Sequence, residues 1–95
     1  MTESIAVLKT SRFRKAYKKL HNLQKDRMDE AIAVIVANPE RGEAKRGDLA
    51  GIYVYKFDCI GQQFLLAYEW NPTTRILCAV GVHENFYRDL KRSTQ

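Results

Sequence analysis

The sequence predicts one small α+β domain, in which an N-terminal strand and a helical hairpin pack on a mainly antiparallel sheet of about four strands. Apolar residues recur at helical spacing between Phe13 and Val36, and they alternate with polar ones from Ile52 onward. The chain has 95 residues, and a chain of this size forms one core because it buries only about two-thirds of its unfolded surface. We therefore expect residues 1–95 to fold as a single domain.

The first part of the chain is expected to form a strand and two helices. Residues 5–9 suit a short strand, and Thr10 or Ser11 can cap the helix that follows. The apolar residues of this helix fall on one stripe, which consists of Phe13, Tyr17 and Leu20. A second helix over residues 23–37 ends before Pro39, because proline disfavours the helical conformation of the residue that precedes it.

The second part of the chain is expected to form the sheet. Residues 38–51 are polar and charged and contain glycine, which is typical of a surface loop. Alternation then predicts strands at about 52–58, 63–70 and 75–82, and the short connections between them favour antiparallel hairpins. Apolar and charged residues on opposite sides of segment 84–92 predict a short C-terminal helix.

Alternation also assigns the side chains of these three strands to the two faces of the sheet. The face expected to pack on the helices carries nine apolar side chains, namely Tyr53, Tyr55, Phe57, Phe64, Leu66, Tyr68, Ile76, Cys78 and Val80. The other face is expected to carry Lys56, Gln63, Leu65, Arg75, Leu77, Ala79 and, at the end of the last strand, His83. This second face is therefore expected to be basic at two points and to have a histidine at its rim.

The motifs exclude several classes of chemistry. The sequence contains no Walker A loop, GxGxxG, HExxH or nucleophile elbow, so no cofactor or metal is expected. Cys59 and Cys78 lack metal-ligand spacing and are expected to be core thiols. No apolar run approaches the roughly 18 residues of a membrane span, and the N-terminus lacks a signal-peptide pattern, which favours a cytoplasmic protein without membrane contact.

The charge is positive and unevenly distributed. Sixteen Lys and Arg against eleven Asp and Glu give a net charge of +5. Six cations occur together with no acidic residue among them, namely Lys9, Arg12, Arg14, Lys15, Lys18 and Lys19. This excess favours contact with a polyanion or an acidic protein, although a solvated helix face gives the same pattern.

One pair of residues suits acid–base chemistry on RNA. His83 is followed four residues later by Tyr87, in a chain rich in Lys and Arg. RNA cleavage without a metal needs a base for the 2′-hydroxyl proton, an acid for the departing 5′-oxygen, and cations for the charged phosphorane. A histidine with its ordinary pKa of about 6.5 can take either proton role. A structural role for His83 is the alternative.

Three stretches, in this order, resemble the RelE/ParE superfamily of bacterial type II toxins. Residues 45–53 (KRGDLAGIY) are similar to the family's basic loop and the start of its central strand. Residues 65–69 (LLAYE) are similar to the following strand, and residues 79–87 (AVGVHENFY) to the terminal strand and turn. The resemblance implies a compact α+β toxin that is neutralised by a cognate antitoxin wrapped around it.

The resemblance also implies roles for single residues. His83 matches the catalytic arginine or histidine at the end of the family's last strand, and Tyr87 matches an aromatic residue that stacks on or near the substrate base. Lys45 and Arg46 match loop residues that contact RNA, and Lys56 matches a basic residue of the central strand.

At one position the chain departs from the family's pattern. Many nuclease members carry an arginine where this chain has Leu65, in a place suited to stabilise the transition-state phosphate. Arg75 of the neighbouring strand is the candidate replacement, on the basis of same-face alternation alone. A YafQ-like member also lacks that arginine and uses a histidine in its final strand, which His83 resembles, and Asp58 and Gln63 are the nearest equivalents of its other active-site residues.

Two activities remain open from the sequence. The first is a ribosome-dependent endoribonuclease that cuts mRNA, with His83 as general acid or base, Tyr87 as stacking platform, phosphate contacts from Lys45, Arg46, Lys56 and Arg75, and the basic first helix along ribosomal RNA. The second is a non-enzymatic, ParE-like inhibitor that binds DNA gyrase with the same surface. The retained His–Tyr pair favours the nuclease, and the missing strand arginine favours the inhibitor. A module that binds only an antitoxin is a third possibility.

Overall fold

The computed structural model describes residues 4–82. Its elements are β1 (Ala6–Lys9), α1 (Ser11–Lys18), α2 (Asn22–Ala37), the 3-10 turns η1 (Pro39–Arg41) and η2 (Gly47–Leu49) with β2 (Glu43–Ala44) between them, β3 (Tyr53–Cys59), β4 (Gln62–Asn71) and β5 (Thr74–Val82). The two helices and four of the strands lie where the sequence predicts them, to within a residue or two. The expected helix at 84–92 lies outside the described residues.

Within residues 4–82 the sheet has five strands in the order β1-β5-β4-β3-β2, one more than expected. β1 runs parallel to β5, and the other pairs are antiparallel. The additional strand lies in the predicted loop, where Glu43 and Ala44 pair with Val54 and Tyr53. A strand of two residues shows no alternation, so its pairing is visible only once the chain after α2 lies beside β3.

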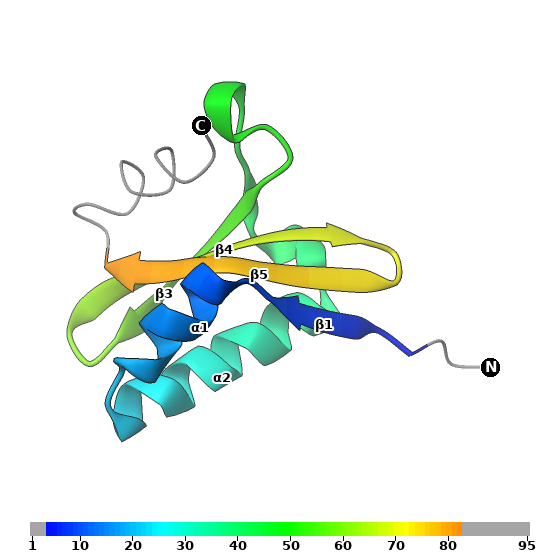
Figure 1. Cartoon of the computed structure of the whole chain (residues 1–95). Coiled ribbons are helices and arrows are strands. Elements are labelled where there is room, and N and C mark those ends of the chain that lie inside the picture. Colours follow the sequence, from blue (N-terminus) through cyan, green and yellow to red (C-terminus); the bar gives the residue numbers. More distant parts are fainter. Residues whose placement is uncertain (1–3, 83–95) are drawn as a thin grey trace.

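α1 and α2 cover one face of the sheet, called here the helix face (Figure 1). Thr10 caps α1, because its hydroxyl accepts a hydrogen bond from the Phe13 N–H at 3.1 Å and donates one to the Cys78 carbonyl at 2.9 Å. The cap therefore attaches the start of α1 to β5. Neither helix of the described part is long and apolar enough to cross a membrane.

The main core lies between the helices and the helix face. Phe13 from α1, Met28 and Ile35 from α2, and Leu66 and Tyr68 from β4 are all almost completely buried there. The Tyr68 hydroxyl donates to the Pro39 carbonyl at 2.6 Å and accepts from the Gly42 N–H at 2.9 Å. Tyr68 thus holds the turn after α2, and a Cβ on Gly42 would clash with its hydroxyl.

The predicted side-chain faces are correct for β3 and β4 and wrong for half of β5. Ala67 pairs with Ala79, but its neighbour Tyr68 pairs with Leu77, so Cys78 is an extra, bulged residue. The bulge reverses the alternation on its N-terminal side, and this places Leu77 in the main core. Ile76, Cys78 and Arg75 consequently lie on the faces opposite to those predicted.

Candidate functional site

The face of the sheet opposite the helices, called here the loop face, carries a second small core. Leu49 and Ile52, from the loop before β3, pack against apolar side chains of three strands, namely Val54, Leu65, Ala67 and Ala79. Leu65 is completely buried in this cluster. The position where many nuclease members carry an arginine is therefore occupied by an apolar contact that attaches the basic loop to the sheet.

Two of the predicted phosphate contacts lie near the same carboxylate. The Lys45 ammonium is 2.6 Å from Oε1 of Glu43, and this pair lies at the edge of the loop face. The hydrogen bond and charge of Lys45, with a smaller contribution from the charge of Lys56, lower the pKa of Glu43. Arg46 follows on the same loop and is exposed, as is Lys56. The structure therefore brings Lys45 and Lys56 close to the same carboxylate, and Arg46 is the next residue of the loop.

The last residues of β5 lie close to Lys56 in the sheet. Lys56, Leu65 and Gly81 form one row across β3, β4 and β5, and Val82 pairs with Phe64 in the next row. His83 follows Val82 in the sequence. His83 and Tyr87 lie outside the described residues, so their roles stay predictions.

Arg75 does not join this group, and the same-face prediction for it is wrong. Because of the bulge, Arg75 lies on the helix face, where only 4% of its surface is exposed. Its guanidinium donates to the Val36 carbonyl at the end of α2, and to the Asn71 and Thr74 carbonyls of the β4–β5 hairpin. These bonds occupy the group, so it is not available to a phosphate on the loop face.

The two cysteines are protonated at neutral pH. Cys59 is buried as expected, and burial raises the pKa of its thiol. Cys78 is half-buried on the loop face, with its Sγ 3.7 Å from Oε2 of Glu69. Burial, followed by the charge of Glu69, raises the pKa of Cys78 to about 12. Neither thiol is a nucleophile under these conditions, because the thiolate is the reactive form.

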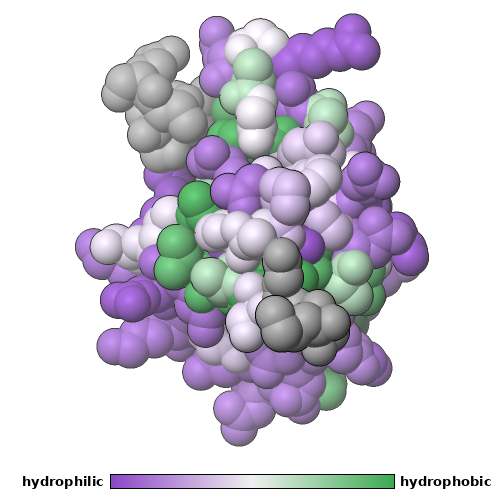
Figure 2. Space-filling view, turned by 90° about the vertical axis from the view of Figure 1, so that its right-hand side faces the viewer, coloured by the Kyte–Doolittle hydropathy of each residue, from purple (hydrophilic) through white to green (hydrophobic). Residues whose placement is uncertain are grey.

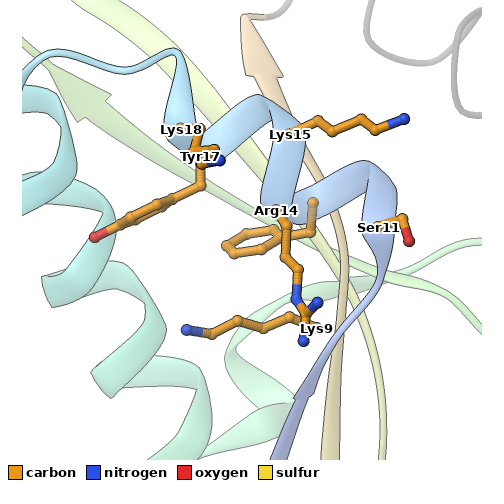
Figure 3. A pocket seen from close by; sticks show the side chains of 7 residues that line it. Lys9, Ser11, Arg14, Lys15, Tyr17 and Lys18 are labelled. Carbon is orange, nitrogen blue, oxygen red and sulfur yellow. The ribbon is translucent and has the colours of Figure 1, made fainter.

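A second basic surface lies on α1. Figure 3 shows the side chains around a groove of about 530 Å³ beside α1 and the end of β1, lined by Lys9, Ser11, Phe13, Arg14, Lys15, Tyr17 and Lys18. The six clustered cations of this segment are all exposed, and none forms an ion pair with another residue of segment 4–82. The predicted accumulation of positive charge is therefore present on the surface.

One residue of the candidate site was not expected from the sequence. Glu43 forms an ion pair with Lys45, and the charge of Lys56 also lowers its pKa, yet the sequence predicted only that Glu43 lies in a polar, charged surface loop. Residues two apart on a strand point to the same side, so the Glu-Ala-Lys sequence at 43–45 would have indicated this pair had the strand been recognised. Asp58 and Gln63, the other candidates, face each other across β3 and β4 and are exposed.

Comparison with known proteins identifies the family. The family model described as a ParE-like toxin of type II bacterial toxin-antitoxin systems matches residues 7–91. A search of curated proteins finds no match. Among solved structures, an arginine-to-alanine double mutant of the E. coli toxin RelE in the free state has a TM-score of 0.70 at 19% identity, covering 94% of this chain and 97% of that one.

Two further structures agree with this fold. A chain of the intact E. coli RelBE toxin–antitoxin complex has a TM-score of 0.69 at 17% identity, covering 85% of this chain and 99% of that one. The YoeB/ParE toxin from Agrobacterium tumefaciens has a TM-score of 0.65 at 14% identity, covering 83% and 99%. The predicted family is confirmed, and the chain belongs to the ParE-like toxins of type II bacterial toxin–antitoxin systems.

Proposed function

We propose that this toxin cleaves mRNA on the ribosome, as a metal-independent endoribonuclease with no cofactor. The observation that carries the proposal is that Lys45 and Lys56 lie close to Glu43 on the loop face, with Arg46 next in the loop and Lys56 in the same row of the sheet as Gly81 of β5. The residue after β5 in the sequence is His83, and a histidine side chain suits proton transfer at neutral pH.

The proposed chemistry divides between these residues. His83 transfers the proton, as base for the 2′-hydroxyl or acid for the 5′-oxygen, and Tyr87 stacks on a base next to the cleaved bond. Lys56 and Arg46 hold the phosphate, where positive charge stabilises the phosphorane as its negative charge develops. Lys45 contributes charge while it positions Glu43.

We further propose that a cognate antitoxin neutralises the toxin. Support comes from the similar E. coli RelBE structure, which is a toxin–antitoxin complex, and from a RelE structure solved with a peptide of its antitoxin. The basic surfaces of this chain, which has a net charge of +5, favour an acidic partner of this kind.

Inhibition of DNA gyrase is the second candidate function. The specific observation in its favour is that the sheet lacks two cations that a nuclease would use, because Leu65 is core and Arg75 is bonded to backbone carbonyls. In that case the loop side would bind protein, and His83 would have no proton to transfer.

Induced expression without an antitoxin separates the two functions. For the nuclease, growth should stop, primer extension should show new 5′ ends within coding sequences, and plasmid supercoiling should stay normal. His83→Gln cannot shuttle a proton, so its cleavage should fall on the order of 100- to 10,000-fold. Tyr87→Phe keeps the stacking ring and serves as the matched control, with little loss expected.

The opposite pattern would replace the nuclease with the gyrase inhibitor. In that outcome His83→Gln stays fully toxic, no new 5′ ends form, and plasmids become relaxed in the arrested cells. Unimpeded growth at high soluble expression of the unmodified chain would remove both activities.

A further inference from the structure

We propose that the outer edge of β3 pairs with the same edge of a second copy of this chain, so that the two sheets join antiparallel around a two-fold axis at Phe57. This inference goes beyond the proposed function, because it concerns association of the toxin with itself. The edge ends at the β3–β4 turn (Figure 1), at the end of the sheet away from the side that Figure 2 shows. That side, where apolar side chains lie between hydrophilic regions, stays open in the dimer.

The backbone of β3 has hydrogen-bonding groups without a strand partner along this edge. Within residues 4–82, β2 pairs with the first two residues of β3 only, and no strand lies beside the rest of the outer edge. The Lys45 N–H donates to the Ile52 carbonyl at 2.9 Å, so the backbone of Ile52 faces the outer side. In an antiparallel ladder the residues of a strand face its two neighbours alternately. The N–H and C=O groups of Lys56 and Asp58 therefore point outward, away from β4.

The chain before β2 leaves this edge open. The Gly42 N–H donates to the Tyr68 hydroxyl at 2.9 Å, and Tyr68 lies in the main core on the helix face. Seen from β2 toward α2, the chain thus turns from the sheet edge onto the helix face at Gly42. A second strand can consequently lie beside β3 from Tyr55 onward.

The charges of the edge fit a second copy in one register. Lys56 and Asp58 are exposed, and neither forms an ion pair within residues 4–82. When Phe57 lies opposite Phe57 of the second copy, Lys56 of each chain lies opposite Asp58 of the other, in pairs that also exchange backbone hydrogen bonds. The two neighbouring registers place Lys56 opposite Lys56 or Asp58 opposite Asp58, where like charges repel. Charges commonly protect a sheet edge from pairing, but this alternation of opposite charges selects a self-complementary contact.

The helix face of the edge supplies apolar contact in the same register. Phe57 is half-buried, and opposite residues at its position do not exchange hydrogen bonds, which brings their Cα atoms to about 4.5 Å. The two Phe57 rings therefore pack on each other across the axis. A groove of about 340 Å³ between α2 and this edge, lined by Val34, Tyr55, Phe57 and Ile60 among others, leaves room for side chains of the second copy.

The net charge of +5 does not oppose this contact strongly. The clustered cations lie on α1 and the end of β1, and α1 packs on β5. β5 is two strands away from β3, which is about 10 Å and exceeds the screening length of about 8 Å at physiological salt. The pairing of Lys56 with Asp58 therefore dominates the electrostatics at the axis.

The dimer also occupies one of the proposed phosphate contacts. In the dimer the carboxylate of Asp58 from the second copy lies beside the Lys56 ammonium, where it competes with an RNA phosphate. This consequence rests on the proposed function, whereas the dimer itself does not. Sedimentation measures the dimer without reference to RNA, so the failure of one is distinguishable from the failure of the other.

Sedimentation equilibrium and NMR hydrogen exchange on the full chain test the association. The interface is small, so we expect the average mass to rise from one chain toward two over a range of about 10 μM to 1 mM. In the dimer the amides of Lys56 and Asp58 should exchange at least about threefold more slowly, because they become hydrogen-bonded. The Phe57 amide, which faces β4, should change little.

Two charge variants test the register. Lys56→Glu places carboxylates opposite each other and Asp58→Lys places ammonium groups opposite each other, so each variant alone should stay monomeric. Mixed in equal amounts, the two should form a heterodimer, because every contact again joins opposite charges. Lys19→Glu and Asp48→Lys make the same charge changes at exposed positions of other elements. Each of these controls should dimerise as the unmodified chain does, and mixing them should add nothing.

Three results would overturn the proposal. The first is the mass of a single chain over the whole concentration range, and the second is a dimer in which the amides of Lys56 and Asp58 exchange as fast as in the monomer. The third is a mixture of the two charge variants that stays monomeric while both are folded. The first two measurements use the unmodified chain, so they decide the proposal even if a variant fails to fold.

Discussion

Ile60 is a residue whose backbone conformation conflicts with its side chain. It has φ of 51°, and Gly61 follows with φ of 78° in the two-residue turn between β3 and β4. Such turns favour Asn-Gly, because a β-branched residue at positive φ costs roughly 1–2 kcal/mol. The side chain of Ile60 is half exposed, so the burial that it gains offsets little of this strain.

Ile60→Asn should therefore stabilise the fold. We expect the free energy of unfolding to rise by about 1 kcal/mol, which for a domain of this size raises Tm by roughly 4–8 °C. Urea denaturation measures the first quantity and calorimetry the second. Gly61→Ala is the opposite control and should destabilise, and an unchanged midpoint for Ile60→Asn would show that the turn carries no strain.

Cys78 should stay unreactive at neutral and mildly alkaline pH. Its pKa of about 12 keeps the thiol protonated at pH 8, so disulfide reagents should label the native protein slowly. Glu69→Gln removes the charge that adds to the effect of burial, so it should lower the pKa and speed labelling. A cysteine of the unfolded chain has a pKa near 9, whereas Cys78 of the folded chain has a pKa of about 12. As pH rises from about 9 to 12 the thiol therefore ionises in the unfolded state but not in the folded state, so the free energy of unfolding falls. Rapid labelling of the native state at pH 8 would contradict this.

At the scale of elements, a buried arginine joins the end of α2 to the β4–β5 hairpin. Arg75 bonds to the Val36 carbonyl at 3.1 and 3.3 Å and to the Asn71 carbonyl at 2.6 Å, and its guanidinium lies 5.8 Å from the Trp70 ring centroid. The last carbonyls of a helix have no partner within the helix, so the positive charge stabilises this end of α2. Arg75 is therefore a structural residue of the fold.

Arg75→Met should destabilise the fold, and Lys56→Met should not. Loss of the charged hydrogen bonds of Arg75 should lower the free energy of unfolding by about 1.5–3 kcal/mol. Lys56 is exposed, so its substitution should change stability by less than about 0.5 kcal/mol while it reduces mRNA cleavage. Urea denaturation and primer extension give the two readouts. A stable but inactive Arg75→Met protein would restore Arg75 as a phosphate contact.

At the scale of the whole molecule, positive charge lies on two separate surfaces. One is the loop side with Lys45, Arg46 and Lys56, and the other is α1 with the end of β1. The sheet lies between them, since α1 packs on the helix face. If the toxin acts on the ribosome as proposed, we expect both surfaces to contact phosphates of ribosomal RNA.

Ribosome binding should consequently depend steeply on salt. Each phosphate that a cation neutralises releases condensed counterions, and one lost contact reduces the slope of log K against log salt concentration by about 1. Arg46→Gln and Lys15→Gln should each reduce the slope by that amount in a pelleting assay. Arg27→Gln is the control, because Arg27 is already paired with Glu30 at 3.1 Å. A slope near zero for the unmodified chain would indicate a dry protein interface instead.

The sequence by itself determined the class of fold, the family and the limits of most elements. These features depend on local patterns, such as the stripe in α1, the alternation along β3 and β4, and Pro39 after α2. The loop cations Lys45 and Arg46 were also predicted from the sequence, because they lie in a polar, charged stretch that is typical of a surface loop and match basic loop residues of the family that the chain resembles. His83 and Tyr87 rest on sequence alone.

Only the tertiary structure decided which side chains meet. The bulge at Cys78 depends on how β4 and β5 align, and it moved Arg75 from the predicted phosphate site into the core. The pairing of Glu43 with Lys45 and the covering of Leu65 by Leu49 and Ile52 depend on where the loop lies on the sheet. Local periodicity carries no information on such contacts, because they join residues whose proximity is fixed by the packing of the whole chain.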